Sequence, residues 1–399
     1  MRTEGRDSGA GDARAAARAL HDRLGSWLRD AALPLWSQQG YDRTQGGFAE
    51  RLTAGGAVSD DARRARVQVR QVYVFANAAA LGWQGDAAPL VQEGLAHFLR
   101  RYRRSDGLFR TLCAADGSPL DERAFLYDQA FVLLALAESQ KVLGAQAHLG
   151  AEAGRLLAAM HRLLKRTGPG YDSGLPERLP LLANPHMHLL EAALAWRELA
   201  SAPVWTELVA EIEALALSRL IDARSGALIE RFGADWRALP GIEGRLIEPG
   251  HLFEWAWLLQ RCGGAAAHAA AVRLIGIAER HGVRAGVTIN ALLDDFSVQD
   301  AGARLWPQTE RLKANARLAI TQPQCWTAAV EAGETLLRYL APVPAGLWYD
   351  RLTVEGTFII EPSPASSLYH IVAACLELQS ALAAATPGQV RSPRLPHPQ

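Results

Sequence analysis

A repeat of about 60 residues constrains the fold of this chain more than any other feature. A glycine followed by a short apolar run recurs in segments such as "QGGFAERL", "RSGALIERF" and "PAGLWYDRL", with the glycines at positions 47, 107, 170, 226, 286 and 346. Long helical patterns such as "DERAFLYDQAFVLLALAESQ" lie between them. A unit of this length holds one helix hairpin with its loop. The strand-like runs are too short and too few for a sheet-based domain.

Six helix hairpins either stack as an open solenoid or close into a ring. A closed ring needs one helix per unit that is apolar nearly all round, because that helix packs on both neighbours and on the interior. Segments starting near 67, 124, 185, 249, 306 and 364 have this character, and their partners, such as "ELVAEIEALALSRL", are amphipathic. We therefore predict an all-α fold, a single (α/α)6 barrel over residues 13–385 with β-hairpin-like loops. A helical solenoid is the alternative, and the polar ends, 1–12 and 386–399, are predicted to be disordered tails.

Charge and cysteine usage narrow the class of function. The chain has 42 basic and 42 acidic side chains, so it has no net charge to attract nucleic acid or an anionic membrane. The Arg-rich stretch "DARRAR" at 61–66 is short and mixed with acids, and we interpret it as a solvated face. The four cysteines lie far apart, without metal-ligand spacing. The sequence has neither the apolar core of a signal peptide nor a membrane-spanning window, so we predict a cytoplasmic protein. We also predict that it is a monomer or a homodimer.

Polar residues interrupt the apolar helices soon after they start. Arg70, Asp128, His188, His251, Glu310 and His370 follow one another at steps of 58, 60, 63, 59 and 60 residues. A lone His–Glu pair at a helix start has a structural explanation, but a series in phase with the repeat points to one end of a central cavity. The candidate site therefore comprises Arg70, Tyr127, Asp128, Asn184, His188, His251, Glu254, Trp306, Glu310, Arg311 and His370. His186 lies on nearly the opposite side of its helix from His188, so we predict that it packs in the core.

Two histidines with supporting carboxylates favour proton-transfer chemistry. Near neutral pH one imidazole serves as base and the other as acid, which is what abstraction of a proton next to a carbonyl needs. Arg70, Asn184 and His188 can hold the oxygen of the resulting enediolate. No Ser or Cys stands beside a base, and no Gly-rich loop opens a βα unit. Spacing alone leaves a metal site open, although "HMH" on a helix is a poor chelate.

Five segments carry a resemblance to a known family. "YDQAFVLLA", "NPHMHLLEA", "EPGHLFEWAWLL", "RLWPQTERLKA" and "SSLYH" resemble the signature blocks of the N-acylglucosamine 2-epimerase family, in order and spacing, from about Trp36 to about Leu378. The family includes mannose isomerases, cellobiose 2-epimerases and sulfoquinovose isomerase-type enzymes. The resemblance implies an (α/α)6 barrel that converts an open-chain sugar through a cis-enediol, with neither a catalytic metal nor another cofactor. It assigns the acid/base pair to His251 and His370, the orientation of His251 to Glu254, and substrate contacts to Arg70, Asn184, His188, Trp306 and Glu310.

The activity within the family is predicted from fewer residues. Leu368 in "SLYH" offers no stacking face where a disaccharide epimerase is expected to have a tryptophan, so we predict an isomerase of free D-mannose and D-fructose. The alternatives within the family are a 2-epimerase of N-acylglucosamine, mannose/glucose or cellobiose, and an isomerase of mannose 6-phosphate that uses Arg245, Arg311 or Lys313. Outside the family stand an inverting glycosidase that uses Asp128, Glu254 and Glu310, and a non-catalytic helical repeat protein.

Overall fold

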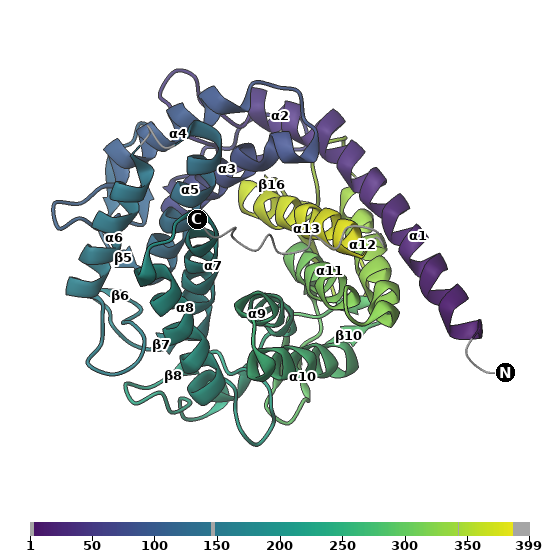
Figure 1. Cartoon of the computed structure of the whole chain (residues 1–399). Coiled ribbons are helices and arrows are strands. Elements are labelled where there is room, and N and C mark those ends of the chain that lie inside the picture. The colour runs from purple at the N-terminus through teal and green to yellow at the C-terminus, as the bar shows by residue number, and fades with distance from the viewer. Residues whose placement is uncertain (1–3, 145–147, 342, 386–399) are drawn as a thin grey trace, which may run out of the picture.

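The computed structural model describes residues 4–144, 148–341 and 343–385. Over these residues six inner helices are surrounded by six outer helices (Figure 1). The inner helices are α3 (Ala65–Ala78), α5 (Leu126–Leu143), α7 (Ala183–Leu199), α9 (Pro249–Cys262), α11 (Leu305–Ala319) and α13 (Ala365–Ala384). The outer helices are α1 (Glu4–Trp27), α4 (Ala87–Tyr102), α6 (Leu149–Leu163), α8 (Pro203–Leu215), α10 (Ala265–His281) and α12 (Trp326–Leu340). The predicted (α/α)6 barrel is confirmed, and each inner helix starts within two residues of its predicted position.

The two ends of the chain close the ring. Helix α1 runs into a π-helical turn (Leu28–Ala32) and α2 (Leu33–Gln38), and it packs against α12 and α13 (Figure 1). Strand β1 (Arg51–Leu52) pairs with β16 (Ser363–Pro364), so the first and last units are joined by backbone hydrogen bonds. The alternative of an open solenoid is therefore wrong.

The predicted N-terminal tail, residues 1–12, is helical from Glu4 onward. The segment that follows, "ARAAARAL", is rich in strong helix formers, which favours extension of the helix toward the N-terminus. The predicted C-terminal tail, 386–399, lies outside the described residues.

Short antiparallel strands form a collar at one end of the barrel. Each inner helix is preceded by a two-residue strand that pairs with a strand from a neighbouring glycine loop. The collar pairs are β1 with β16, β2 (Arg63–Arg64) with β3 (Leu112–Cys113), β5 (Ala124–Phe125) with β6 (Gly174–Leu175), β7 (Leu181–Leu182) with β8 (Arg231–Phe232), β9 (Leu246–Ile247) with β12 (Ala291–Leu293), and β14 (Ala303–Arg304) with β15 (Arg351–Leu352). Three strands, β4 (Pro119–Asp121), β11 (Val287–Thr288) and β13 (Val298–Asp300), extend these loops, and β10 (Val283–Arg284) pairs with β11.

Backbone hydrogen bonds from the collar place the inner helices at one height. The first residue of an inner helix donates its N–H to a carbonyl in the glycine loop of the next unit, and the first residue of the last helix donates to a carbonyl of the first unit. These bonds run from Ala65 to Thr111, Leu126 to Ser173, Ala183 to Glu230, Leu305 to Asp350 and Ala365 to Glu50, at 2.8–3.1 Å. In α9 the first residue is Pro249, which has no N–H.

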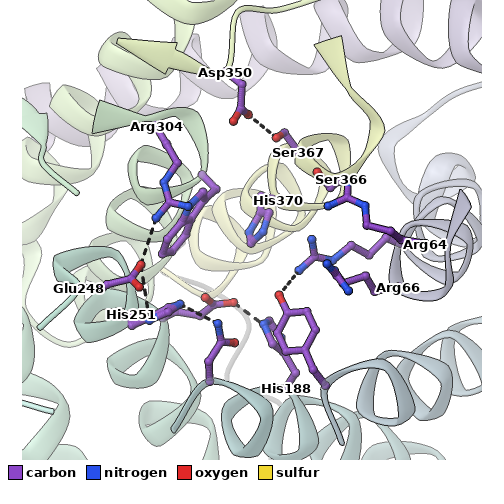
Figure 2. Close-up of a pocket in the computed structure, with 15 residues that line it drawn as sticks. Arg64, Arg66, His188, Glu248, His251, Arg304, Asp350, Ser366, Ser367 and His370 are labelled. Atoms are coloured by element: carbon purple, nitrogen blue, oxygen red, sulfur yellow. Dashed lines mark hydrogen bonds and ion pairs between the residues drawn. The ribbon is translucent and has the colours of Figure 1, made fainter. Parts of the chain in front are cut away.

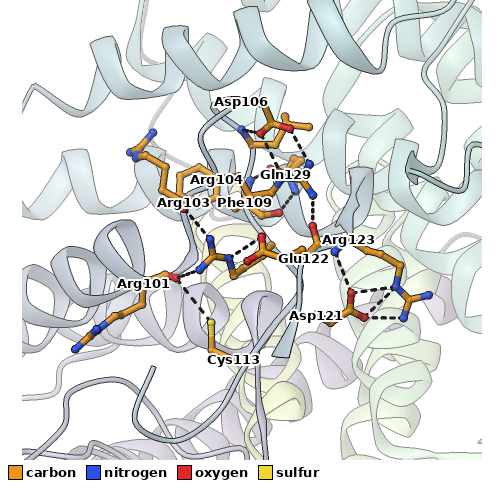
Figure 3. A network of polar contacts seen from close by, with 12 residues as sticks. Arg101, Arg103, Arg104, Asp106, Phe109, Cys113, Asp121, Glu122, Arg123 and Gln129 are labelled. Atoms are coloured by element: carbon orange, nitrogen blue, oxygen red, sulfur yellow. Dashed lines mark hydrogen bonds and ion pairs between the residues drawn. The ribbon is translucent and has the colours of Figure 1, made fainter. Parts of the chain in front are cut away.

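A side chain on the fourth residue of an inner helix fixes the glycine loop of the same unit. Figure 3 shows this for Gln129, which accepts the N–H of Phe109 at 2.8 Å and donates to its carbonyl at 2.9 Å. Gln68 and Gln308 make the same pair of bonds with their own loops. In the third unit His186 takes this place, and its Nε2 accepts the N–H of Tyr171 at 3.0 Å. The predicted packing role of His186 is therefore confirmed.

Helix α13 is long and apolar enough to cross a membrane by length and composition alone, contrary to the expectation from the sequence. Its apolar window is 72% buried inside the protein, because α13 packs between α3 and α11 at the centre of the barrel. Its burial accounts for its composition. The cytoplasmic location and the monomeric or homodimeric state stay predictions.

Candidate active site

The second and the sixth residue of each inner helix form two tiers at the collared end of the barrel. These positions are four apart, so they share one face of each helix. The upper tier, at the second position, is Arg66, Tyr127, Asn184, Gly250, Trp306 and Ser366; the lower tier, at the sixth, is Arg70, Phe131, His188, Glu254, Glu310 and His370. Nine of these twelve residues line one cavity of about 260 Å³.

The cavity opens among the collar loops, and Figure 2 shows its side chains converging from all sides. It is lined by Arg64, Arg66, Arg70, Tyr127, Asn184, His188, Glu248, His251, Glu254, Arg304, Trp306, Asp350, Ser366, Ser367 and His370. The sequence analysis placed eight of these residues in the site: Arg70, Tyr127, Asn184, His188, His251, Glu254, Trp306 and His370.

His251 enters the cavity from the third position of its helix, not from the sixth as the predicted series implied. Its Nδ1 lies 3.0 Å from Oε1 of Glu230 and 3.9 Å from Oε2 of Glu248. Burial alone would lower the pKa of His251, but these two carboxylates raise it to about 10. His251 is therefore an imidazolium at neutral pH.

The other ring nitrogen of His251 faces Asn184. Nε2 lies 3.2 Å from Nδ2 of Asn184, while Oδ1 of that amide is buried without a hydrogen-bond partner among the described residues. A charged imidazole donates from both nitrogens. The amide orientation that turns Oδ1 toward Nε2 therefore satisfies both groups, and Asn184 then fixes the ring plane of His251.

His370 has the opposite electrostatic environment. Its Nδ1 lies 2.8 Å from Oε1 of Glu310. Burial, the Arg70 guanidinium and the Lys313 ammonium hold the pKa of His370 well below its usual value. A neutral His370 that donates Nδ1–H to Glu310 presents the lone pair of Nε2 to the cavity. The histidines thus face one cavity with their pKa values moved in opposite directions.

The ring of Trp306 lies against both histidines. Its centroid is 5.0 Å from that of His251 and 5.7 Å from that of His370, with tilted planes. A methyl group added to the neighbouring Gly250 would meet the Trp306 ring at 2.5 Å. The absence of a side chain at the upper-tier position of α9 thus makes room for this indole.

Glu254 does not orient His251, contrary to the prediction. No hydrogen bond or ion pair joins the two among the described residues, and Glu230 makes that contact instead. Oε1 of Glu254 is 4.0 Å from Nδ1 of His188 and has no hydrogen-bond partner in the part of the chain that the structure describes. Burial and the nearby charge of Glu310 raise the pKa of Glu254 well above its usual value. This environment favours the protonated form of Glu254, which is able to donate a hydrogen bond in the cavity wall.

His188 and Arg70 line the floor of the cavity. Nδ1 of His188 lies 3.0 Å from Oε2 of Glu191, and burial lowers the pKa of this histidine to about 4, so it is neutral. Arg70 donates to the hydroxyl of Tyr127 at 2.8 Å and stacks at 4.2 Å over the ring of Phe131. Its Nε–H has no partner among the described residues. These groups offer donors and acceptors to an oxygen-rich ligand.

Three predicted site residues lie behind the cavity wall. Asp128, at the third helix position, is fully buried and holds Arg66 through a 3.4 Å contact. Glu310 supports His370 without lining the cavity. Arg311 points outward, where its guanidinium binds Glu279 of α10 and Glu331 of α12. Of the three carboxylates named for the alternative of an inverting glycosidase, only Glu254 therefore lines the cavity.

Other side chains named in the sequence analysis also lie away from the cavity. Lys313 is buried beside Glu310, with Nζ 2.6 Å from Oε2, and Arg245 is bound to Asp294 and Asp295. Neither reaches a ligand in this cavity. Leu368 is fully buried and does not line the cavity. This position therefore does not support the prediction of a monosaccharide substrate.

Glu230, which contacts His251, and Arg64 and Arg66 at the mouth of the cavity were not predicted from the sequence. Arg64 and Arg66 line the cavity and Arg63 is buried, so the interpretation of "DARRAR" as a solvated face is wrong for its three arginines. Glu230 has a signal in the sequence that was not used. It belongs to a column of polar residues in the glycine loops: Glu50, Thr111, Ser173, Glu230, Asn290 and Asp350. In three units the side chain of this column contacts the third residue of the following inner helix: Thr111 with Asp128, Glu230 with His251 and Asp350 with Ser367.

Three groups of carboxylates and histidines have the spacing of metal ligands among the described residues. They are His188, Glu191 and Glu254; Glu230, Glu248 and His251; and Glu254, Glu310 and His370. In the second group a protonated His251 has no lone pair for a metal. In the other two, His188 donates to Glu191, and the ammonium of Lys313 neutralises Glu310. A metal-free reaction stays a prediction.

The sequence of this chain is similar to those of known proteins. Residues 46–374 match the N-acylglucosamine 2-epimerase (GlcNAc 2-epimerase) family. A mannose-6-phosphate isomerase of Rhizobium meliloti (strain 1021) is 44% identical over 373 residues, which cover 90% of this chain and 96% of the relative. A D-mannose isomerase of Thermobifida fusca is 28% identical over 262 residues, 62% of each chain.

A solved structure agrees with these relatives on the fold. The cellobiose 2-epimerase of Spirochaeta thermophila DSM 6192 superposes with a TM-score of 0.82 at 21% identity, over 92% of this chain and 97% of that one. The resemblance noted in the sequence is confirmed. The chain belongs to the N-acylglucosamine 2-epimerase family and is an enzyme of the isomerase class, a sugar isomerase or epimerase.

Proposed function

We propose that this protein is an aldose–ketose isomerase that interconverts a mannose-configured aldohexose and the corresponding fructose through a cis-enediol. The observation that carries the proposal is the pair of histidines, which face one cavity with oppositely shifted pKa values. Titratable groups whose environments separate their pKa values mark the acid and the base of a reaction. The relatives named mannose-6-phosphate isomerase and D-mannose isomerase support isomerisation rather than epimerisation.

The two histidines divide the proton transfers. Neutral His370 takes the proton from C2 of the open-chain aldose, and the electrons of that C–H bond form the C1–C2 double bond. The carbonyl electrons move to O1, which takes the place of the Asn184 amide at Nε2 of His251 and receives the proton of that nitrogen. His251 then takes the proton of the O2 hydroxyl as the C2 carbonyl forms, and His370 returns its proton to C1. The product is the ketose, and both histidines recover their starting states.

The remaining cavity residues hold the sugar. Arg70 donates to the oxygens that gain charge in the enediolate, which lowers the barrier most when the donor is fixed before reaction. His188, whose Nε2 keeps its lone pair, accepts a hydrogen bond from a sugar hydroxyl. Glu254, whose protonated form its burial favours, donates to a hydroxyl group. Trp306 supplies an apolar face against both histidines. A cavity of about 260 Å³ suits a ligand smaller than the drug-sized molecules of typical pockets, so a monosaccharide fits better than a disaccharide.

Proton NMR in deuterium oxide tests the proposal. The protein is incubated with mannose, mannose 6-phosphate, glucose, fructose, N-acetylglucosamine and cellobiose. We expect a fructose-type product with deuterium at C1 from a mannose-configured substrate. A C2-epimeric aldose with deuterium at C2 as the main product would make the protein a 2-epimerase and reject the proposed isomerisation.

A further inference from the structure

The mouth of the cavity has arginines that the proposed proton transfers do not use. Arg64, Arg66 and Arg304 all line it. Arg304 is held at 3.1 Å by Glu248, the carboxylate that also lies near His251, so it belongs to the environment of the acid. Arg64 and Arg66 lie together on the other side of the cavity, with Ser366 (Figure 2).

The charge of Arg66 is only weakly compensated. Its one ion pair among the described residues is with Asp128, at 3.4 Å, although a guanidinium has five N–H groups. Burial raises the pKa of Asp128, which weakens this partner further. The Arg66 side chain is 28% exposed and extends over the Tyr127 ring, with its central carbon 5.6 Å from the ring centroid. It therefore has donors left for a ligand.

Two neighbours complete a group of donors around Arg66. Arg64 is the N-cap residue of α3, and its Nε and one terminal nitrogen bind Oε2 of Glu50 at 2.8 and 2.7 Å. The side chain is 33% exposed, so the remaining N–H groups are accessible. Ser366 lines the same cavity, and its hydroxyl makes no hydrogen bond to the described residues, whereas that of Ser367 is bound to Asp350 at 2.5 Å.

Arg66 is placed to contact the C6 end of a bound sugar. Arg66 stands four residues before Arg70 on α3, so it lies about one helical turn, or roughly 5.4 Å, nearer the mouth. In the proposed function Arg70 holds oxygens of the reacting C1–C2 end. The C6 end of the open chain then extends toward Arg66, Arg64 and Ser366.

We propose that Arg66, with Arg64 and Ser366, forms a subsite for a phosphate ester at C6, so that the substrate is a hexose 6-phosphate. Arginine forks bind phosphate oxygens through charge-assisted hydrogen bonds, while an uncharged hydroxymethyl group would leave Arg66 with only its long contact to Asp128 as a counter-charge. The subsite adds a substrate class to the proposed function. It rests on that function, because the placement of C1 and C2 near Arg70 determines where C6 lies. It replaces Arg245, Arg311 and Lys313, which the sequence analysis named for a phosphate.

Steady-state kinetics with two substrates tests the subsite. We expect kcat/KM for mannose 6-phosphate to exceed that for mannose at least about tenfold. Arg66→Gln should reduce this preference about tenfold or more, mainly through KM, because a contact made equally in ground and transition states affects binding. Arg66→Lys should keep part of the preference as a point charge, and Ser366→Ala, which removes no charge, should lower it severalfold.

The matched control is Arg51→Gln. Arg51 lies in the same collar, is 42% exposed and pairs with Asp61 at 3.6 Å, but it does not line the cavity. This control should leave the preference unchanged. A sulfate ester at C6 shares the tetrahedral oxygens with one negative charge fewer, so mannose 6-sulfate should rank between the phosphate ester and mannose. A sulfate ester preferred over the phosphate ester would overturn the assignment to phosphate.

The binding of inorganic phosphate separates failure of the subsite from failure of the proposed function. Calorimetry should detect phosphate binding to the wild-type protein and a loss of at least about tenfold in affinity with Arg66→Gln. If no aldose is converted but phosphate binds in this way, the proposed function is wrong and the anion subsite stands. Equal turnover of mannose and mannose 6-phosphate, or an equal loss for both substrates in Arg66→Gln, overturns the subsite.

Discussion

Glu230 and His251 meet at 3.0 Å although one lies in a collar loop and the other at the start of an inner helix. The carboxylate raises the pKa of His251 toward 10 against the effect of burial. The acid form of His251 is therefore present below about pH 10 and is lost as the pH rises through that value. In the proposed function, this pair therefore sets the alkaline limit of activity.

Replacing Glu230 should move that limit. Glu230→Gln removes the carboxylate that raises the pKa of His251 most, so the alkaline limb of the pH–rate profile should fall by at least about one pH unit. Glu254→Gln should shift the limb less, since Glu254 raises the pKa of His251 less than Glu230 and Glu248 do. Profiles of kcat measured from pH 5 to 11 compare the two variants. An alkaline limb that stays in place in Glu230→Gln would remove His251 from the role of acid.

Solvent exchange separates the two histidines. His370→Ala removes the base at carbon, so deuterium from the solvent should no longer enter C1 or C2, while the sugar still binds. His251→Ala should also stop turnover, because O1 no longer receives its proton. Both variants should keep the circular dichroism spectrum of the wild type. Carbon exchange that persists in His370→Ala and disappears only in His251→Ala would show that the two roles are reversed.

Burial distinguishes two ion pairs of the same spacing. Lys313 and Glu310 are three residues apart and both fully buried, with 2.6 Å between Nζ and Oε2. Lys141 and Glu138 have the same spacing at 2.7 Å, but Lys141 is 41% exposed. Lys313→Met leaves buried carboxylates without their cation and should cost about 3–5 kcal/mol in the free energy of unfolding. Lys141→Met should cost about 1 kcal/mol or less. Urea denaturation measures both, and similar losses would contradict the assigned role of Lys313.

A methyl group at position 250 should disturb catalysis without weakening the helix. Gly250→Ala places its Cβ 2.5 Å from the Trp306 ring, which must shift from its position against both histidines. We expect kcat/KM to fall about tenfold, the result of a small misplacement of a positioning group. Gly276→Ala in α10 meets nothing within 4 Å and should stabilise the protein by about 0.4–1 kcal/mol with unchanged kinetics. Unchanged kinetics in Gly250→Ala would show that the position of Trp306 does not matter to turnover.

Chelation should leave turnover intact. Glu310 is neutralised by Lys313, Glu191 is hydrogen-bonded to His188, and His251 is protonated. Activity after exhaustive treatment with EDTA should match that of the untreated protein. A large loss that a divalent metal restores would reject the metal-free reaction.

The sequence predicted the barrel well because each glycine loop marks one unit and each inner helix is buried on almost every side. The heights of the site residues were harder to obtain. Asp128 and His251 stand at the third helix position and the other members of the predicted series at the sixth. These heights differ by less than one turn, and the difference depends on where the collar bonds start each helix. Spacing along the chain does not contain that information.

The helical pattern of the sequence also does not predict contacts between different units. Glu230 was passed over because it lies in a loop, and Arg64 and Arg66 because a short basic run usually lies in solvent. Only the closed collar turns these side chains toward the cavity. The polar column of the glycine loops contained the signal for Glu230, since it recurs in all six units.

The bond from Ala365 to Glu50 gives the ring no terminal unit in its hydrogen-bonding pattern. An open repeat array can fray from its ends, because an end unit has one neighbour and its stability is a local sum. Here the first and last units support each other, so the loss of one hairpin removes a contact on both of its sides. Such a cycle favours unfolding in a single cooperative transition, in which the acid, the base and the arginines at the mouth are lost together.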